Sequence, residues 1–96
     1  MNEKVLITSK RSAEISNLVQ GLKSIGIQVR LLTDGRMTLE RLDEQCPAAI
    51  IIDNELPDRS GLDLCRIIKT EERTRSVFVL LLVNDLTYQR EGFELA

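Results

Sequence analysis

The sequence predicts an α/β protein built on a parallel sheet with helices on both faces. Short apolar runs that suit buried strands alternate with segments whose apolar residues recur at helical spacing over all 96 residues. One of these runs, residues 48–52, ends on the carboxylate of Asp53. Strict alternation of strand and helix favours a doubly wound parallel sheet with right-handed crossovers.

The first half of the chain supplies two such units. Residues 4–8 are predicted to form a short strand, and Ser12 is then predicted to cap a helix that Gly26 ends. Residues 27–31 alternate apolar and polar side chains, which predicts a strand with one less buried face, as at the edge of a sheet. The apolar positions that define the first helix are Ile15, Leu18, Val19, Leu22 and Ile25.

The second half repeats this order around the strand at residues 48–52. A weaker helix is predicted over residues 35–44, and a stronger one from Gly61, where Ser60 and Asp63 have the spacing of a capping box. The side chains of this later helix that are expected to face inward are Leu64, Cys65, Ile67 and Ile68.

The last predicted strand, residues 77–83, is seven apolar residues long and is expected to be buried on both faces. A weak helical segment is predicted from Leu86 onward.

Asp53 begins the most informative motif of the chain. The strand before it delivers this carboxylate to the C-terminal edge of the sheet, where open α/β sheets place their reactive groups. Pro57 and Gly61 follow at steps of four and shape the loop that returns into a helix. This Asp-x-x-x-Pro-x-x-x-Gly pattern resembles the phosphoacceptor loop of bacterial response-regulator receiver domains.

The resemblance covers residues 1–96 as one domain and implies a flavodoxin-like sheet in the order 2-1-3-4. It also implies that Asp53 is the phosphoacceptor. Family members continue into a fifth strand and helix, and by this resemblance we expect the chain to stop before them.

The residues expected around the phosphoacceptor are largely replaced. Where the resemblance implies an acidic pair that binds Mg²⁺, the chain has Ser9 and Lys10, and where it implies a switch hydroxyl, the chain has Val83. Asp53 and the backbone carbonyl of Glu55 remain as metal ligands, so Mg²⁺ is expected to bind weakly or not at all. We hypothesise that Lys10 lies beside Asp53 in place of the metal charge; the alternative is that Lys10 points to solvent.

The resemblance implies a cytoplasmic, non-enzymatic module of two-component phosphorelay signalling. We expect it to regulate an output domain or partner through protein contacts, with Mg²⁺-dependent phosphorylation of Asp53 impaired. The alternative is a functional phosphoacceptor that a histidine kinase phosphorylates. The apolar strand at residues 77–83 predicts either a longer natural polypeptide, or a homodimer that pairs two copies along this edge.

Composition excludes several other classes. Thirteen basic and fifteen acidic residues give a net charge of −2, so nothing draws this domain to nucleic acid or an anionic membrane. No segment approaches the ~20 apolar residues of a membrane span, and the N-terminus lacks the apolar core of a signal peptide. Cys46 and Cys65 lack motif spacing and are expected to be free thiols.

Two other functions are alternatives. The hydroxyls and cations of residues 8–12 suit an anion, such as a flavin or nucleotide phosphate, but the chain has no Trp and one Tyr to stack on a flavin. A haloacid-dehalogenase-like phosphatase needs a second aspartate two residues after the first, where this chain has Glu55.

Overall fold

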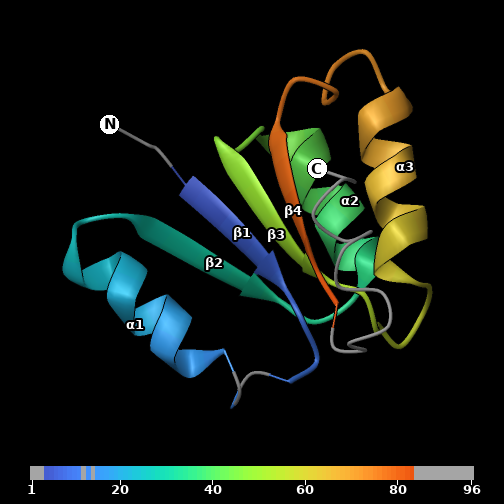
Figure 1. The fold of residues 1–96 in the computed structure, drawn as a ribbon. Coiled ribbons are helices and arrows are strands. Elements are labelled where there is room, and N and C mark those ends of the chain that lie inside the picture. The colour runs from blue at the N-terminus through green and yellow to red at the C-terminus, as the bar shows by residue number, and fades with distance from the viewer. Residues whose placement is uncertain (1–3, 12, 14, 84–96) are drawn as a thin grey trace.

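The fold is a four-stranded parallel sheet in the order β2-β1-β3-β4 (Figure 1). The computed structural model describes residues 4–11, 13 and 15–83. This order and the alternation of strand and helix confirm the predicted fold class. The elements are β1 (Lys4–Thr8), α1 (Ser16–Ser24), β2 (Gln28–Leu32), α2 (Gly35–Glu44), β3 (Ala49–Asp53), α3 (Gly61–Thr70) and β4 (Phe78–Leu82).

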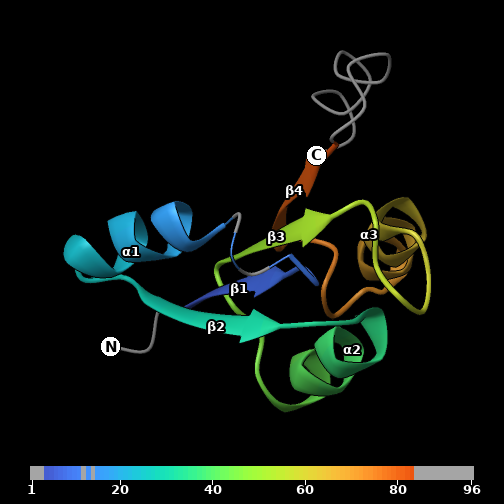
Figure 2. The same cartoon turned by 90° about the horizontal axis from the view of Figure 1, so that it is seen from below.

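The two faces of the sheet are covered unequally. Helices α2 and α3 lie together on one face, whereas α1 lies on the other beside β2 (Figure 2). The face under α2 and α3 holds the core, and no residue of α1 is fully buried. The buried apolar side chains that are at most 1% exposed are Leu6, Ile7, Ile50, Ile52, Leu64, Ile68 and Val79.

The prediction that the last strand is buried on both faces is wrong. Val79 and Leu81 point into the core, but Leu80 and Leu82 are only half-buried and Phe78 is 59% exposed. The reason is that α1 packs against β2, at the far side of the sheet from β4. The pairing of two copies along β4 stays a prediction.

Most element boundaries follow from local signals. Helix α2 has the predicted bounds because Asp34 caps it, its Oδ1 accepting the amide of Met37 at 2.8 Å. Ser60 caps α3 by accepting the amide of Asp63 at 3.1 Å.

Two boundaries differ from the prediction. Helix α1 begins at Ser16, and the expected cap Ser12 lies outside the described residues, as does the predicted segment from Leu86. Strand β2 runs one residue later than predicted, because Leu32 is the side chain that enters the core. Over the described ranges, no helix has the length and hydropathy needed to cross a membrane.

Candidate functional site

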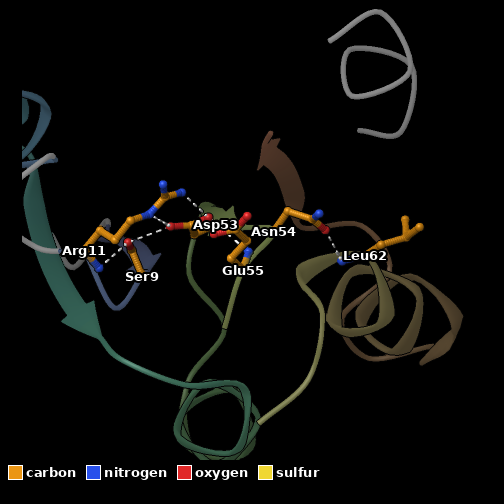
Figure 3. A network of polar contacts seen from close by, with 6 residues as sticks. All are labelled: Ser9, Arg11, Asp53, Asn54, Glu55 and Leu62. Atoms are coloured by element: carbon orange, nitrogen blue, oxygen red, sulfur yellow. Dashed lines mark hydrogen bonds and ion pairs between the residues drawn. The ribbon is translucent and has the colours of Figure 1, made fainter. Parts of the chain in front are cut away.

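Asp53 and Ser9 meet at the C-terminal edge of the sheet (Figure 3). Asp53 is the last residue of β3, Ser9 follows β1, and these two strands are parallel neighbours. Asp53 is 2% exposed and Ser9 is fully buried. The Ser9 hydroxyl donates to Oδ2 of Asp53 at 3.0 Å, so the residue at the first acidic-pair position is a hydrogen-bond donor to the aspartate.

Arg11 forms a bidentate ion pair with the same carboxylate. Its Nε donates to Oδ2 of Asp53 at 2.9 Å, and its Nη2 donates to Oδ1 at 2.7 Å. The side chain of Arg11 is 24% exposed, against 3% for that of Asp53. The planar guanidinium matches a carboxylate in this geometry, and short charge-assisted bonds of this kind are about twice as strong as neutral ones.

These contacts use the full accepting capacity of the Asp53 carboxylate. Oδ2 accepts from Ser9 and from Nε of Arg11, and Oδ1 accepts from Nη2 of Arg11 and from the amide of Glu55 at 3.1 Å. An ionised carboxylate has about four lone-pair sites. Each oxygen therefore accepts two hydrogen bonds, which accounts for both of its lone-pair sites.

Lys10 does not make the contact hypothesised for it. Its side chain is exposed, and the cation beside Asp53 is Arg11, the next residue along the chain. The sequence signal was present, because an arginine fork suits a buried carboxylate better than a lysine ammonium does. The same pairing engages Ser9 and Arg11, two residues of the predicted anion loop, with a carboxylate of the protein itself.

The β3–α3 loop, residues 54–60, closes back on the end of β3. Glu55 and Ser60 form an antiparallel bridge across it, and the amide of Gly61 donates to the carbonyl of Asn54 at 2.8 Å. A Cβ atom at position 61 would lie 2.7 Å from Cα of Asn54 and would overlap the carbonyl oxygen of Asp53. Only glycine fits this approach, whereas the side chain of Pro57 is exposed.

Asp58, in the same loop, forms hydrogen bonds with the N-terminus of α2. Its Oδ1 accepts the amide of Gly35 at 2.9 Å, and its Oδ2 accepts the amide of Arg36 at 3.0 Å. The hydrogen bond from Gly35 is the largest cause that lowers the pKa of the Asp58 carboxyl below its ordinary value. Asp58 could not be identified from the sequence as a functional residue, because no spacing rule connects it to residues 35 and 36.

Val83, at the position of the switch hydroxyl, is half-buried and packs against the core cluster. An aliphatic side chain neither donates nor accepts a hydrogen bond. This position therefore contributes packing to the end of β4.

The donor set around Asp53 does not fit Mg²⁺. This ion requires near-octahedral oxygen ligands and is usually bound through one or two carboxylates that have free lone pairs. Here the acidic-pair positions hold a buried hydroxyl and an exposed ammonium, and the side chain of Glu55 is exposed. The described stretches contain no group of three His, Cys, Asp or Glu side chains that could hold a metal ion.

A parallel sheet in the order 2-1-3-4, with an aspartate at the end of β3, defines a flavodoxin-like receiver fold. The profile of the response regulator receiver domain matches residues 5–96. The chain therefore belongs to the receiver-domain family of two-component signalling.

Relatives and solved structures agree with this assignment. The chain is 26% identical over 94 residues to the alkaline phosphatase synthesis transcriptional regulatory protein PhoP of Bacillus subtilis, covering 98% of this chain and 37% of that protein. It thus spans well under half the length of such curated relatives.

A putative response regulator from Chloroflexus aurantiacus matches with a TM-score of 0.87 at 26% identity, over 100% of this chain and 80% of that one. The receiver domain of a sensor histidine kinase from Pseudomonas aeruginosa matches with a TM-score of 0.84 at 26% identity, over 100% of this chain and 80% of that one. That structure has a magnesium ion coordinated in its active site cleft.

Proposed function

We propose that this chain is a receiver module that regulates an output domain or partner through protein contacts, with Mg²⁺-dependent phosphorylation of Asp53 impaired. Its partners in this role are the proteins of a two-component pathway, a histidine kinase or an output domain. The family as a whole consists of signalling domains that are generally non-enzymatic.

The observation that supports the proposal is that the Asp53 carboxylate already accepts four hydrogen bonds. Phosphoryl transfer to this group requires a free oxygen lone pair, and a metal ion to neutralise the incoming charge. Arg11 takes one lone pair on each oxygen, and its positive charge opposes the approach of Mg²⁺. Mg²⁺ would have to displace Arg11 from this carboxylate, so the interaction energy of the ion pair is lost when the metal binds.

The replaced positions around Asp53 support the same reading. Ser9 is committed to Asp53 as a donor, and Val83 packs where a hydroxyl would be needed to respond to a phosphoryl group. Even a phosphorylated Asp53 would lack that response. The role of Asp53 in this proposal is structural, since it joins the ends of β1 and β3 to the first turn of the β3–α3 loop.

The test is an amide NMR titration with Mg²⁺ and then beryllofluoride, a phosphoryl mimic, of the wild-type chain and of the variants Arg11→Gln and Lys10→Gln. We expect no saturable shift at residues 53–61 in the wild type at millimolar Mg²⁺. Arg11→Gln frees one acceptor site on each oxygen of Asp53, so its amide shifts on titration should be larger than those of the wild type. Lys10→Gln is the matched control because Lys10 is exposed and should behave as the wild type does.

Saturable shifts in the wild type at residues 53–61 would instead support the alternative, a functional phosphoacceptor with an unusual metal arrangement. Equal behaviour of the two variants would mean that Arg11 does not block the site.

A further inference from the structure

The N-terminus of α2 is capped from two different parts of the chain. Asp34, the residue before the helix, accepts the amide of Met37, whereas Asp58 accepts the amides of Gly35 and Arg36 from a position 22 to 23 residues away. The first amides of a helix have no partner within the helix. The start of α2 therefore depends on the position of the β3–α3 loop as well as on its own sequence.

Arg59 brings the two segments into close contact. A Cβ atom at Gly35 would lie 2.8 Å from Cδ of Arg59, so the stem of this arginine lies directly on the first turn of α2. Nε of Arg59 is 3.5 Å from Oδ2 of Asp58, which places a positive charge beside the capping carboxylate. The loop and the helix cannot shift against each other without disturbing these contacts.

The β3–α3 loop connects this cap to the Asp53 site, because residues at both of its ends and Asp58 within it are held by hydrogen bonds. Nη2 of Arg11 and the amide of Glu55 both donate to Oδ1 of Asp53, at 2.7 Å and 3.1 Å. Glu55 pairs with Ser60 across the loop, and Asp58 lies between these two residues. If the ion pair between Arg11 and Asp53 changes, the hydrogen bond from the Glu55 amide to the same oxygen changes with it. Glu55 lies at one end of the loop that contains Asp58.

We propose that Asp58 is a positioning residue that couples the state of the Arg11–Asp53 pair to the N-terminal turn of α2. This route leads away from β4, where Val83 offers no hydrogen bond. The inference goes beyond the proposed function, because it concerns how the site is linked to the rest of the domain and requires neither a metal ion nor a phosphoryl group.

The test measures amide chemical shifts of Met37 and Thr38, whose amides are bonded to Asp34 and not to Asp58. Arg11→Lys keeps the positive charge but loses the bidentate hydrogen bonding, and Arg11→Gln removes the charge as well. Each change is made in the wild type and in the Asp58→Asn background. We expect either Arg11 variant to shift both reporter amides in the wild type, and the shift to fall at least threefold in Asp58→Asn.

Asp63→Asn is the matched control background. Asp63 is another carboxylate near a helix N-terminus, but it is 62% exposed and its ion pair is with Arg66 at 4.0 Å. The response of Met37 and Thr38 should persist there in full. A purely structural role of Asp58 would change the starting shifts but leave the response to the Arg11 variants unchanged.

Two results would overturn the inference. One is a response confined to residues 9–11 and 53–55 in the wild type, and the other is an equal response in the Asp58→Asn and Asp63→Asn backgrounds. Because no Mg²⁺ or beryllofluoride is present, neither result bears on whether Asp53 can be phosphorylated. Arg11→Lys keeps the test usable if Arg11→Gln does not fold.

Discussion

Replacing Arg11 by glutamine is the most direct perturbation of the site. The substitution removes both hydrogen bonds of the guanidinium and leaves a carboxylate that is 3% exposed with the Ser9 hydroxyl and the Glu55 amide as donors. A buried charge that loses its counter-charge is strongly unfavourable, because water cannot reach it fully. We therefore expect Arg11→Gln to destabilise the fold.

The magnitude follows from the burial of the two partners. Removing one member of a fully buried ion pair costs about 3–5 kcal/mol. Arg11 is 24% exposed, so water can enter part of the space it leaves, and two donors to Asp53 remain. We expect a loss of about 2–3 kcal/mol, a large part of the ~5–14 kcal/mol typical of a domain of this length. The corresponding fall in Tm is roughly 10–20 °C.

The assay is equilibrium urea unfolding of the wild type, Arg11→Gln, Asp53→Asn and the double variant. A neutral Gln–Asn pair leaves no buried charge, so the double variant should lose less than the sum of the single losses, with a coupling of about 1–3 kcal/mol. Lys10→Gln, one residue away and exposed, should stay within about 0.5 kcal/mol of the wild type. If Arg11→Gln were as mild as Lys10→Gln, or if the single losses simply added, the ion pair would not stabilise the fold as argued.

Three further predictions concern other described residues. Because the pKa of Asp58 is lowered in the fold, its ionised form stabilises the domain above about pH 4 and this contribution is lost as pH falls below that value, so Asp58→Asn should flatten the acid limb of a urea stability profile. Gly61→Ala should cost about 1–3 kcal/mol because its Cβ overlaps backbone, whereas Gly21→Ala, with nothing within 4 Å, should stabilise α1 by about 0.5–1 kcal/mol. Ellman's reagent should modify exposed Cys46 quickly and Cys65 only on unfolding, because burial raises the pKa of the Cys65 thiol.

Each of these has a result that would contradict it. An unchanged acid limb in Asp58→Asn would mean that the cap on α2 does not depend on charge. Equal effects of alanine at Gly61 and Gly21 would show that the loop relaxes without cost. Fast reaction of both thiols in the native state would show that α3 opens readily.

The fold was predictable because its signals are local. Buried parallel strands are apolar throughout, and the caps of α2 and α3 lie next to the helices they stabilise. The exposure of Phe78 was not predictable, because an apolar run does not say how many helices cover each face. That depends on α1 packing over β2, which is a tertiary property.

The candidate site was predictable only where chain proximity determines it. The positions of Asp53 and Gly61 follow from the strand end and the loop, but the partner of Asp53 comes from a segment 42 residues away. At that distance the sequence offered two neighbouring cations, and the better fit of an arginine fork to a buried carboxylate was the one signal that favoured Arg11 over Lys10. The direction of the chain after the buried Ser9 decides between the two cations, because it leaves the side chain of Lys10 exposed and places that of Arg11 at the carboxylate.

The loop motif and the chemistry of its aspartate are therefore separate properties of this chain. Pro57 and Gly61 belong to the backbone path of the loop, and Gly61 is required there whether or not Asp53 reacts. The chemistry of Asp53 depends as well on residues outside the motif, because Ser9 and Arg11 donate hydrogen bonds to its carboxylate. A phosphoacceptor motif in a receiver sequence thus indicates the fold, and the residues that follow the first strand must be considered before it is taken to indicate phosphorylation.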